Sequence, residues 1–314
     1  MMCMTSIAIA QPAGGFGGLQ APQVKLETSQ EFKDVNYAGD DQAYHTCDIY
    51  LPKQEKAAYP VVIHIYGSAW FSNSSKGMAD LGTIVNSLLK AGYAVVCPNH
   101  RSSMDAKWPA QIHDIRAVIR FVRGEAAKYK FDTQFIATSG FSSGGHLASM
   151  AATTSGTKQT KVGTIDIDLE GEVGSYLKES SAVNAACDWS GPIDLTAMDC
   201  GEGMKMDENS PDSPEDVLLN SKLAKEPDKY ISLSANHYVD PNDPPIIIFH
   251  GDKDNVVPNC QGKAFFETLK AAGVKTEATF PAEGNHGGPA MYTEENLQKM
   301  VHFLDEVRTN RSQH

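Results

Sequence analysis

The sequence predicts an α/β fold in which a mostly parallel central sheet is flanked by helices. Residues 59–66 form a nearly continuous run of apolar and β-branched side chains, which is typical of a strand covered on both faces. Residues 76–91 then follow a helical periodicity, and residues 93–97 form the next apolar run. Strands that alternate with helices in this way build a parallel sheet. We expect residues 31–314 to form one domain, since single α/β units often reach this size.

The remaining elements continue this alternation on both sides of the first buried strand. Residues 43–51 alternate polar and apolar side chains, which predicts a half-buried antiparallel strand at the edge of the sheet. The sequence predicts these further elements in chain order: a helix over 108–123 with Pro109 in its first turn, strands over 134–139, 182–189, 243–251 and 276–280, and a closing helix over 294–307.

The first 30 residues differ in composition from the rest of the chain. Residues 1–10 are apolar and end in a small-x-small pattern at Ala8 and Ala10, as in the rear half of a secretory signal, although no Lys or Arg precedes the run. We therefore expect a partial signal peptide and export to the periplasm or the cell exterior. Residues 11–30 contain Gly, Pro and Gln with little to pack, which predicts a flexible leader.

The overall composition restricts the possible partners. The formal net charge is −12 and the pI is near 5.3, so the phosphates of nucleic acid would be repelled. No apolar run approaches the roughly 20 residues of a membrane-spanning helix, and we expect no membrane partner. Neutral substrates fit this charge better than acidic ones. The sequence makes no prediction of oligomeric state.

One short motif carries the strongest chemical signal. Gly140, Ser142 and Gly144 form a G-x-S-x-G pattern between the strand over 134–139 and a helical pattern over 147–152. This strand–turn–helix context is what a nucleophile elbow requires, because the sharp turn leaves no room for a Cβ at either flank. We predict Ser142 as the nucleophile. Ser143 carries a competing hydroxyl, but the pattern centres on Ser142, and the Ser143 N–H is predicted to stabilise an oxyanion.

A second oxyanion donor is expected where the first buried strand ends. Residues 66–70 read Tyr-Gly-Ser-Ala-Trp, and small side chains at such a strand exit let backbone N–H groups approach a ligand. We predict Gly67 and Ser68 as the donors. Trp70 has two interpretations that the sequence leaves open: it lines the substrate pocket, or it is a packed aromatic side chain.

The partners of the serine are predicted from the exits of the last two strands. Asp254 follows the strand over 243–251 at its carboxyl end, where open α/β sheets place their sites, and Asp252 is the alternative. His286 lies in a glycine-flanked loop after the last strand. The order Ser142, Asp254, His286 is one of several by which serine triads arise. We expect His100 and Arg101, at another strand exit, to be structural.

The six cysteines do not indicate a metal site. No C-x-x-C or H-E-x-x-H spacing occurs, and serine chemistry needs no cofactor, so we expect neither metal nor cofactor. Cys47 and Cys97 lie in strand-like runs and are predicted to be buried. Cys187 and Cys200 bracket one short segment and are the candidates for a disulfide in an oxidising compartment.

These motifs together resemble the α/β-hydrolase superfamily, and within it the feruloyl and acetyl xylan esterase-like group of bacterial polysaccharide-degrading enzymes. The resemblance spans about residues 48–304. It rests on residues 67–70, on 108–110 with Asp114, on 140–146, on 250–254 with 257–258, and on His286. Residues 66–70 depart at three positions from the His-Gly-Gly-Gly-Trp motif of that group.

The resemblance implies an α/β-hydrolase fold and a serine esterase that removes acetyl or hydroxycinnamoyl groups from plant cell wall polysaccharide. The implied partner is a small ester or an acylated saccharide. The segment over 194–237 is a short polar cap, too polar for the lid of a lipase that acts at oil surfaces. Two alternatives remain: a serine peptidase or amidase on the same fold, and a binding protein without catalysis.

Overall fold

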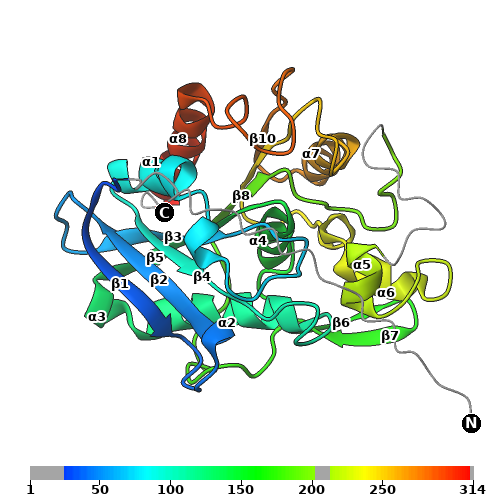
Figure 1. The fold of residues 1–314 in the computed structure, drawn as a ribbon, viewed down its shortest axis with the longest axis horizontal. Coiled ribbons are helices and arrows are strands. Elements are labelled where there is room, and N and C mark those ends of the chain that lie inside the picture. The colour runs from blue at the N-terminus through cyan, green and yellow to red at the C-terminus, as the bar shows by residue number, and fades with distance from the viewer. Residues whose placement is uncertain (1–24, 202–212, 312–314) are drawn as a thin grey trace, which may run out of the picture.

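The computed structural model describes residues 25–201 and 213–311, and its centre is an eight-stranded sheet of order β1-β2-β4-β3-β5-β8-β9-β10 (Figure 1). The pairs β1–β2 and β2–β4 are antiparallel, and the remaining neighbours are parallel. The strand bounds are β1 Thr28–Asn36, β2 Thr46–Pro52, β3 Tyr59–Ile65, β4 Ala94–Pro98, β5 Phe131–Phe141, β8 Ala185–Trp189, β9 Ile246–Phe249 and β10 Thr276–Thr279. The predicted fold class is confirmed.

Helices cover both faces of this sheet. Helices α1 (Asn86–Lys90) and α8 (Glu294–Arg311) lie on one side, and α2 (Ala110–Gly124) and α3 (Ala126–Tyr129) lie on the other (Figure 1). Along β3, Val61 and Ile63 belong to one apolar cluster and Val62 belongs to the other, and all three side chains are fully buried. The continuous apolar run of this strand therefore serves two cores, as a central parallel strand must.

The N-terminal part of the sheet differs from the prediction. Strand β1 begins at Thr28, inside the predicted leader, and it is the edge strand, whereas β2 is paired on both sides. Most β1 side chains are exposed or half-buried, so the strand carries no apolar alternation that would reveal it. The predicted signal peptide and residues 11–24 of the predicted leader lie outside the described residues.

The predicted helix over 76–91 is divided. A 3₁₀ turn over Lys76–Met78, a π-helical turn over Leu81–Val85 and helix α1 share this segment. Asp80 interrupts it with a positive φ of 48°. The helix predicted over 108–123 is α2, but Pro109 precedes it as the N-cap residue and the Trp108–Pro109 peptide bond is cis.

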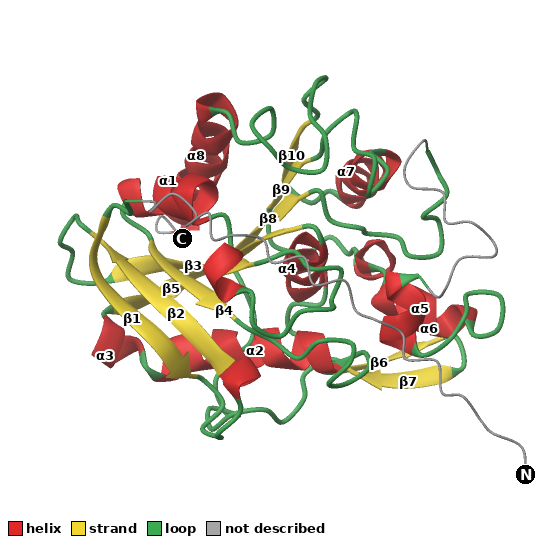
Figure 2. Cartoon of the chain, viewed as in Figure 1, coloured by secondary structure: helices red, strands yellow, loops and turns green. Residues whose placement is uncertain are grey.

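Short elements gather at one end of the molecule and form the cap (Figure 2). The hairpin of β6 (Gln159–Val162) and β7 (Ile165–Asp168) forms a separate small sheet, which the sequence reasoning missed. The polar segment predicted over 194–237 contains helices α5 (Pro214–Leu219) and α6 (Pro227–Leu233) and ends in a 3₁₀ turn over Ala235–Tyr238. Much of its acidic stretch, 206–212, lies outside the described residues. No helix in the described ranges is long and apolar enough to cross a membrane.

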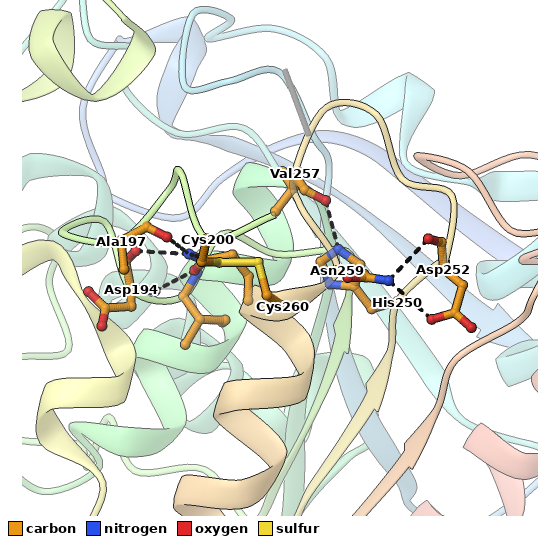
Figure 3. Close-up of a disulfide and its surroundings, with 10 residues drawn as sticks. Asp194, Ala197, Cys200, His250, Asp252, Val257, Asn259 and Cys260 are labelled. Carbon is orange, nitrogen blue, oxygen red and sulfur yellow. Dashed lines mark hydrogen bonds between the residues drawn. A yellow bond between two sulfur atoms is a disulfide. The ribbon is translucent and has the colours of Figure 1, made fainter. Parts of the chain in front are cut away.

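The predicted Cys187–Cys200 disulfide is wrong. Cys200 is bonded to Cys260, the first residue of α7 (Cys260–Ala272), with a Cα–Cα distance of 6.1 Å (Figure 3). Cys187 lies in the interior strand β8, is fully buried and has a free thiol whose pKa is raised by burial. The predicted burial of Cys47 and Cys97 is confirmed.

Candidate active site

The turn between β5 and α4 (Ser143–Thr153) has the geometry of a nucleophile elbow. Ser142 lies at its apex with φ 55° and ψ −124°, a backbone conformation that residues other than glycine rarely adopt. A Cβ at Gly140 would lie 2.2 Å from the carbonyl oxygen of Gly144, and a Cβ at Gly144 would lie 2.1 Å from that of Ile65. The Ser142 N–H donates to the Trp189 carbonyl at 2.8 Å, which fixes the turn against β8.

The three residues predicted as a triad lie in one hydrogen-bonded chain. His286 Nε2 is 2.9 Å from Ser142 Oγ, and His286 Nδ1 is 2.9 Å from Asp254 Oδ2. Ser142 follows β5, Asp254 follows β9 and His286 follows β10, so all three come from the carboxyl ends of parallel strands. The arrangement suits proton transfer from the serine hydroxyl to an imidazole that a carboxylate orients.

The carboxylate of Asp254 is held in its ionised form. Burial alone would raise its pKa, but hydrogen bonds and charge from His286 and the N–H of Val256 bring the pKa below its ordinary value. Its Oδ1 accepts from the Val256 and Val257 N–H groups, each at 2.9 Å. Asp252, the alternative, instead accepts from Asn259 at 3.1 Å, as Figure 3 shows, and pairs with Lys263 at 2.8 Å.

The loop that carries His286 is packed against the elbow. The ring of Phe141 lies 4.8 Å from the imidazole, centroid to centroid. Asn285 Oδ1 accepts from the His286 N–H at 2.8 Å and from the Asn255 N–H at 3.2 Å, which joins this loop to the one after β9. Sequence reasoning did not identify Phe141 or Asn285 as supports, although both are neighbours of predicted residues.

The predicted oxyanion loop lies beside the serine, and one of its two predicted donors, the Ser68 N–H, already has an acceptor. The Ser68 N–H donates to Ser143 Oγ at 2.9 Å and is therefore occupied. A Cβ at Gly67 would lie 2.8 Å from the Phe141 carbonyl oxygen, so this glycine permits close packing. Ala69, with φ 50°, lines the pocket beside Ser142, and its N–H donates no hydrogen bond within the described residues. The small side chain of Ala69 was the feature of the sequence that could have identified this residue as a candidate donor.

The N–H of Ser143 remains a candidate donor. Ser143 is the first residue of α4, and the first N–H groups of a helix have no acceptor within the helix. It lines the same pocket as Ser142 and Ala69. Residues of two separate segments, Ala69 and Ser143, therefore line the pocket beside Ser142 with backbone N–H groups that have no acceptor within the described residues.

A pocket of about 690 Å³ opens at the serine. Trp70 lines it and is also packed edge-on against His146, with 2% of its surface exposed, so it is a packed aromatic side chain at the edge of this pocket. The cap supplies much of the opposite wall. The described wall residues from the cap segment over 194–237 are Leu195, Thr196, Met198, Asp199, Ser213, Pro214, Glu215, Asp216, Leu223 and Tyr230.

The residues expected to be structural lie in other networks. Arg101 forms a charged pair with Asp114 at 2.6 Å, and His100 is buried and stacked on Tyr66. Across 25–201 and 213–311, no group of three or more His, Cys, Asp or Glu residues could hold a metal ion.

Comparison with curated proteins gives esterases. The chain is 30% identical over 217 residues to Esterase LipQ of Mycobacterium tuberculosis, which covers 69% of this chain and 47% of that protein. It is 26% identical over 275 residues to isoprenylcysteine alpha-carbonyl methylesterase ICME of Arabidopsis thaliana, covering 86% and 60%. The chain thus spans only about half the length of the first curated relatives it matches.

Solved structures match over more of the chain. A truncated carbohydrate esterase from gut microbiota is 44% identical with a TM-score of 0.84, covering 90% of this chain and 98% of that one. A bifunctional GH43-CE protein of Bacteroides eggerthii is 46% identical with a TM-score of 0.82, covering 88% and 35%. The family model described as BD-FAE matches residues 47–269. The family match covers most of the protein, and Ser142, His286 and Asp254 are hydrogen-bonded in sequence at the carboxyl edge of the sheet. This protein therefore belongs to the BD-FAE family of α/β-hydrolases.

Proposed function

We propose that this protein is a serine carboxylesterase that removes acetyl or feruloyl-type groups from plant polysaccharide, or from related small esters, through an acyl-enzyme. The observation that carries the proposal is the chain Ser142–His286–Asp254, with both links at 2.9 Å. Ser142 is the nucleophile, His286 the general base and then the general acid, and Asp254 the group that orients the imidazole.

The reaction proceeds in two halves. Ser142 Oγ attacks the ester carbonyl as His286 Nε2 takes its proton, and the N–H groups of Ser143 and Ala69 donate to the developing oxyanion. The imidazolium then protonates the departing alcohol. Water, deprotonated by the same imidazole, attacks the acyl-Ser142 ester and releases the acid, which restores the free hydroxyl.

The proposed substrate class is supported by two observations. The solved structures that match at 44% and 46% identity are described as a carbohydrate esterase and as a GH43-CE protein. The pocket combines apolar walls with the three carboxylates Asp199, Glu215 and Asp216, which suits a neutral, partly polar ligand. We also propose export from the cytoplasm, which the Cys200–Cys260 disulfide supports, because such bonds persist in oxidising compartments.

The function is tested with p-nitrophenyl acetate and a substrate panel. Wild type is expected to release p-nitrophenol, and Ser142→Ala is expected to lose this activity. Equal rates for the two proteins would rule out a mechanism that depends on Ser142. No turnover by either protein would favour a binding protein. The panel contains acetylated xylan, methyl ferulate and aminoacyl amides, compared by kcat/KM. A preference for the amides would favour the peptidase or amidase alternative.

A further inference from the structure

Two adjacent carboxylates in the pocket wall have opposite surroundings. Asp216 accepts from Lys222 Nζ at 2.6 Å and from the Ser213 N–H at 3.1 Å, and it also binds the Tyr230 hydroxyl. Glu215, its neighbour in the first turn of α5, forms no hydrogen bond or ion pair within the described residues, although only 9% of its surface is exposed. Asp216 thus holds the cap together, whereas Glu215 has no structural partner.

The position of Glu215 indicates what its partner is. The same pocket is lined by Ser142 and Glu215, so the small exposed part of this side chain faces the space that substrate enters. Both oxygens of the Glu215 carboxylate are accessible from the pocket and have no donor within the described residues, so a ligand O–H can take the place of water there. Carboxylates accept strong, charge-assisted hydrogen bonds from hydroxyl groups.

The charges around Glu215 exclude an anionic ligand. The described residues that line the pocket include Asp199, Glu215 and Asp216 and no Lys, Arg or His. Lys222 compensates the charge of Asp216, with which it pairs at 2.6 Å, but a substrate carboxylate or phosphate opposite Glu215 would still meet like charge. The ligand group opposite Glu215 is therefore a hydrogen-bond donor without negative charge, and in the proposed ester substrates that group is a hydroxyl.

We infer that Glu215 is a specificity-determining residue, which accepts a hydrogen bond from a hydroxyl group of the substrate bound at Ser142. The inference rests on the proposed esterase function and deepens it. Two substrate parts carry such a hydroxyl: the saccharide ring that is released as the alcohol, and the phenol of a feruloyl group. The hydrogen-bond chemistry is the same in both, and substrate pairs distinguish them.

The experiment compares substrates that differ only in the hydroxyl. The first pair is methyl xyloside carrying one acetyl group and the same monoacetate with its remaining hydroxyl groups methylated. The second pair is methyl ferulate and its phenol-methylated analogue. For each pair, the ratio of kcat/KM for the hydroxyl-bearing ester to that for its blocked analogue is measured in wild type, Glu215→Gln and Glu215→Leu.

We expect Glu215→Gln to lower the ratio of one pair by on the order of 10-fold, and Glu215→Leu by up to about 100-fold, the range for a hydrogen bond to a charged group. A fall in the first pair identifies the saccharide hydroxyl, and a fall in the second identifies the phenol. Unchanged ratios in both pairs would overturn the inference.

Two control variants separate the hydrogen bond from general charge. Glu172→Gln removes the same charge from an exposed position that does not line the pocket, and it should leave both ratios at the wild-type value. Asp199→Asn removes a charge from the exposed part of the same wall and should change the ratios less than Glu215→Gln does. An equal effect of Asp199→Asn would show a non-specific electrostatic effect and would contradict the inference.

Turnover of p-nitrophenyl acetate reports separately on the proposed function. If Glu215→Gln still hydrolyses this ester in a Ser142-dependent reaction while both ratios stay unchanged, the inference fails and the esterase stands. If Ser142→Ala hydrolyses it as fast as wild type, the esterase mechanism fails, and the inference fails with it.

Discussion

The N–H of Ser68 donates to the side-chain oxygen of Ser143 at 2.9 Å, which ties the oxyanion loop to the residue that follows the nucleophile. In the proposed mechanism this contact gives the Ser143 hydroxyl a positioning role, because it holds the loop that carries the Ala69 N–H beside Ser142.

Ser143→Ala removes this tether and is expected to lower kcat several-fold and stability by about 1 kcal/mol, the net value of one hydrogen bond. Hydrolysis of p-nitrophenyl acetate and urea unfolding measure the two effects. A loss of activity as complete as that of Ser142→Ala, in a protein that remains folded, would instead indicate that Ser143 is the nucleophile.

The two acids after β9 provide a matched pair of variants. Asp254→Asn is expected to reduce kcat by about 10³- to 10⁴-fold, since an amide does not stabilise the imidazolium and favours the wrong tautomer. Asp252→Asn should keep kcat within a few-fold of wild type, because Asp252 binds Asn259 and Lys263 rather than His286. Comparable losses in the two variants would contradict this assignment.

Asp188, behind the elbow, predicts a pH dependence of stability. Burial raises the pKa of Asp188 to about 7, and the hydrogen bond from the Gly191 N–H offsets only part of this increase. The folded state therefore binds a proton that the unfolded state releases near pH ~4, and stability falls as pH rises from there to about 7.

Asp188→Asn keeps an oxygen for the Gly191 N–H, at 2.9 Å in the wild type, but cannot ionise. Its free energy of unfolding, relative to wild type, should therefore increase between about pH 5 and pH 8. Urea unfolding at both pH values measures this difference. A difference that is the same at both would refute the raised pKa.

The Cys200–Cys260 bond joins the cap to α7 and closes a sequence separation of 60 residues. Next to it, Gln261 accepts from the Ile193 and Asp194 N–H groups and donates to the Ala197 carbonyl at 2.9 Å. The double variant Cys200→Ala/Cys260→Ala should lose about 4 kcal/mol of stability. It should also show a higher KM, since Met198 and Asp199, just before Cys200, line the pocket.

Reductant provides the control for this variant. A thiol reductant should lower the stability of the wild type toward that of the double variant. It should not change the stability of the double variant. A wild type whose melting temperature and KM are insensitive to complete reduction of the bond would contradict a tethering role.

Sequence alone predicted much of the fold and the three residues of the triad-like chain. Ser142 was predictable because the elbow is a local motif whose two glycines have steric causes. Asp254 and His286 were predictable because strand exits in a parallel sheet share one edge. The buried strands were predictable because β3 and β4 are apolar on both faces.

Features that depend on tertiary contacts were not predictable. Cys200 pairs with Cys260 because the cap folds onto α7, and no local pattern records that contact. The occupied N–H of Ser68 depends on a side chain 75 residues away. Strand β1 was missed because its side chains are largely polar and its pairing with β2, rather than burial, makes it a strand.

The central claim is that an ester's acyl group is transferred to Ser142. It is tested most directly by mixing wild type with p-nitrophenyl acetate, quenching in acid during turnover and locating the acetyl group by peptide mass spectrometry. We predict an acetyl group on Ser142 and none on Ser143. An acetyl group on another residue, with Ser142→Ala as active as wild type, would contradict the account.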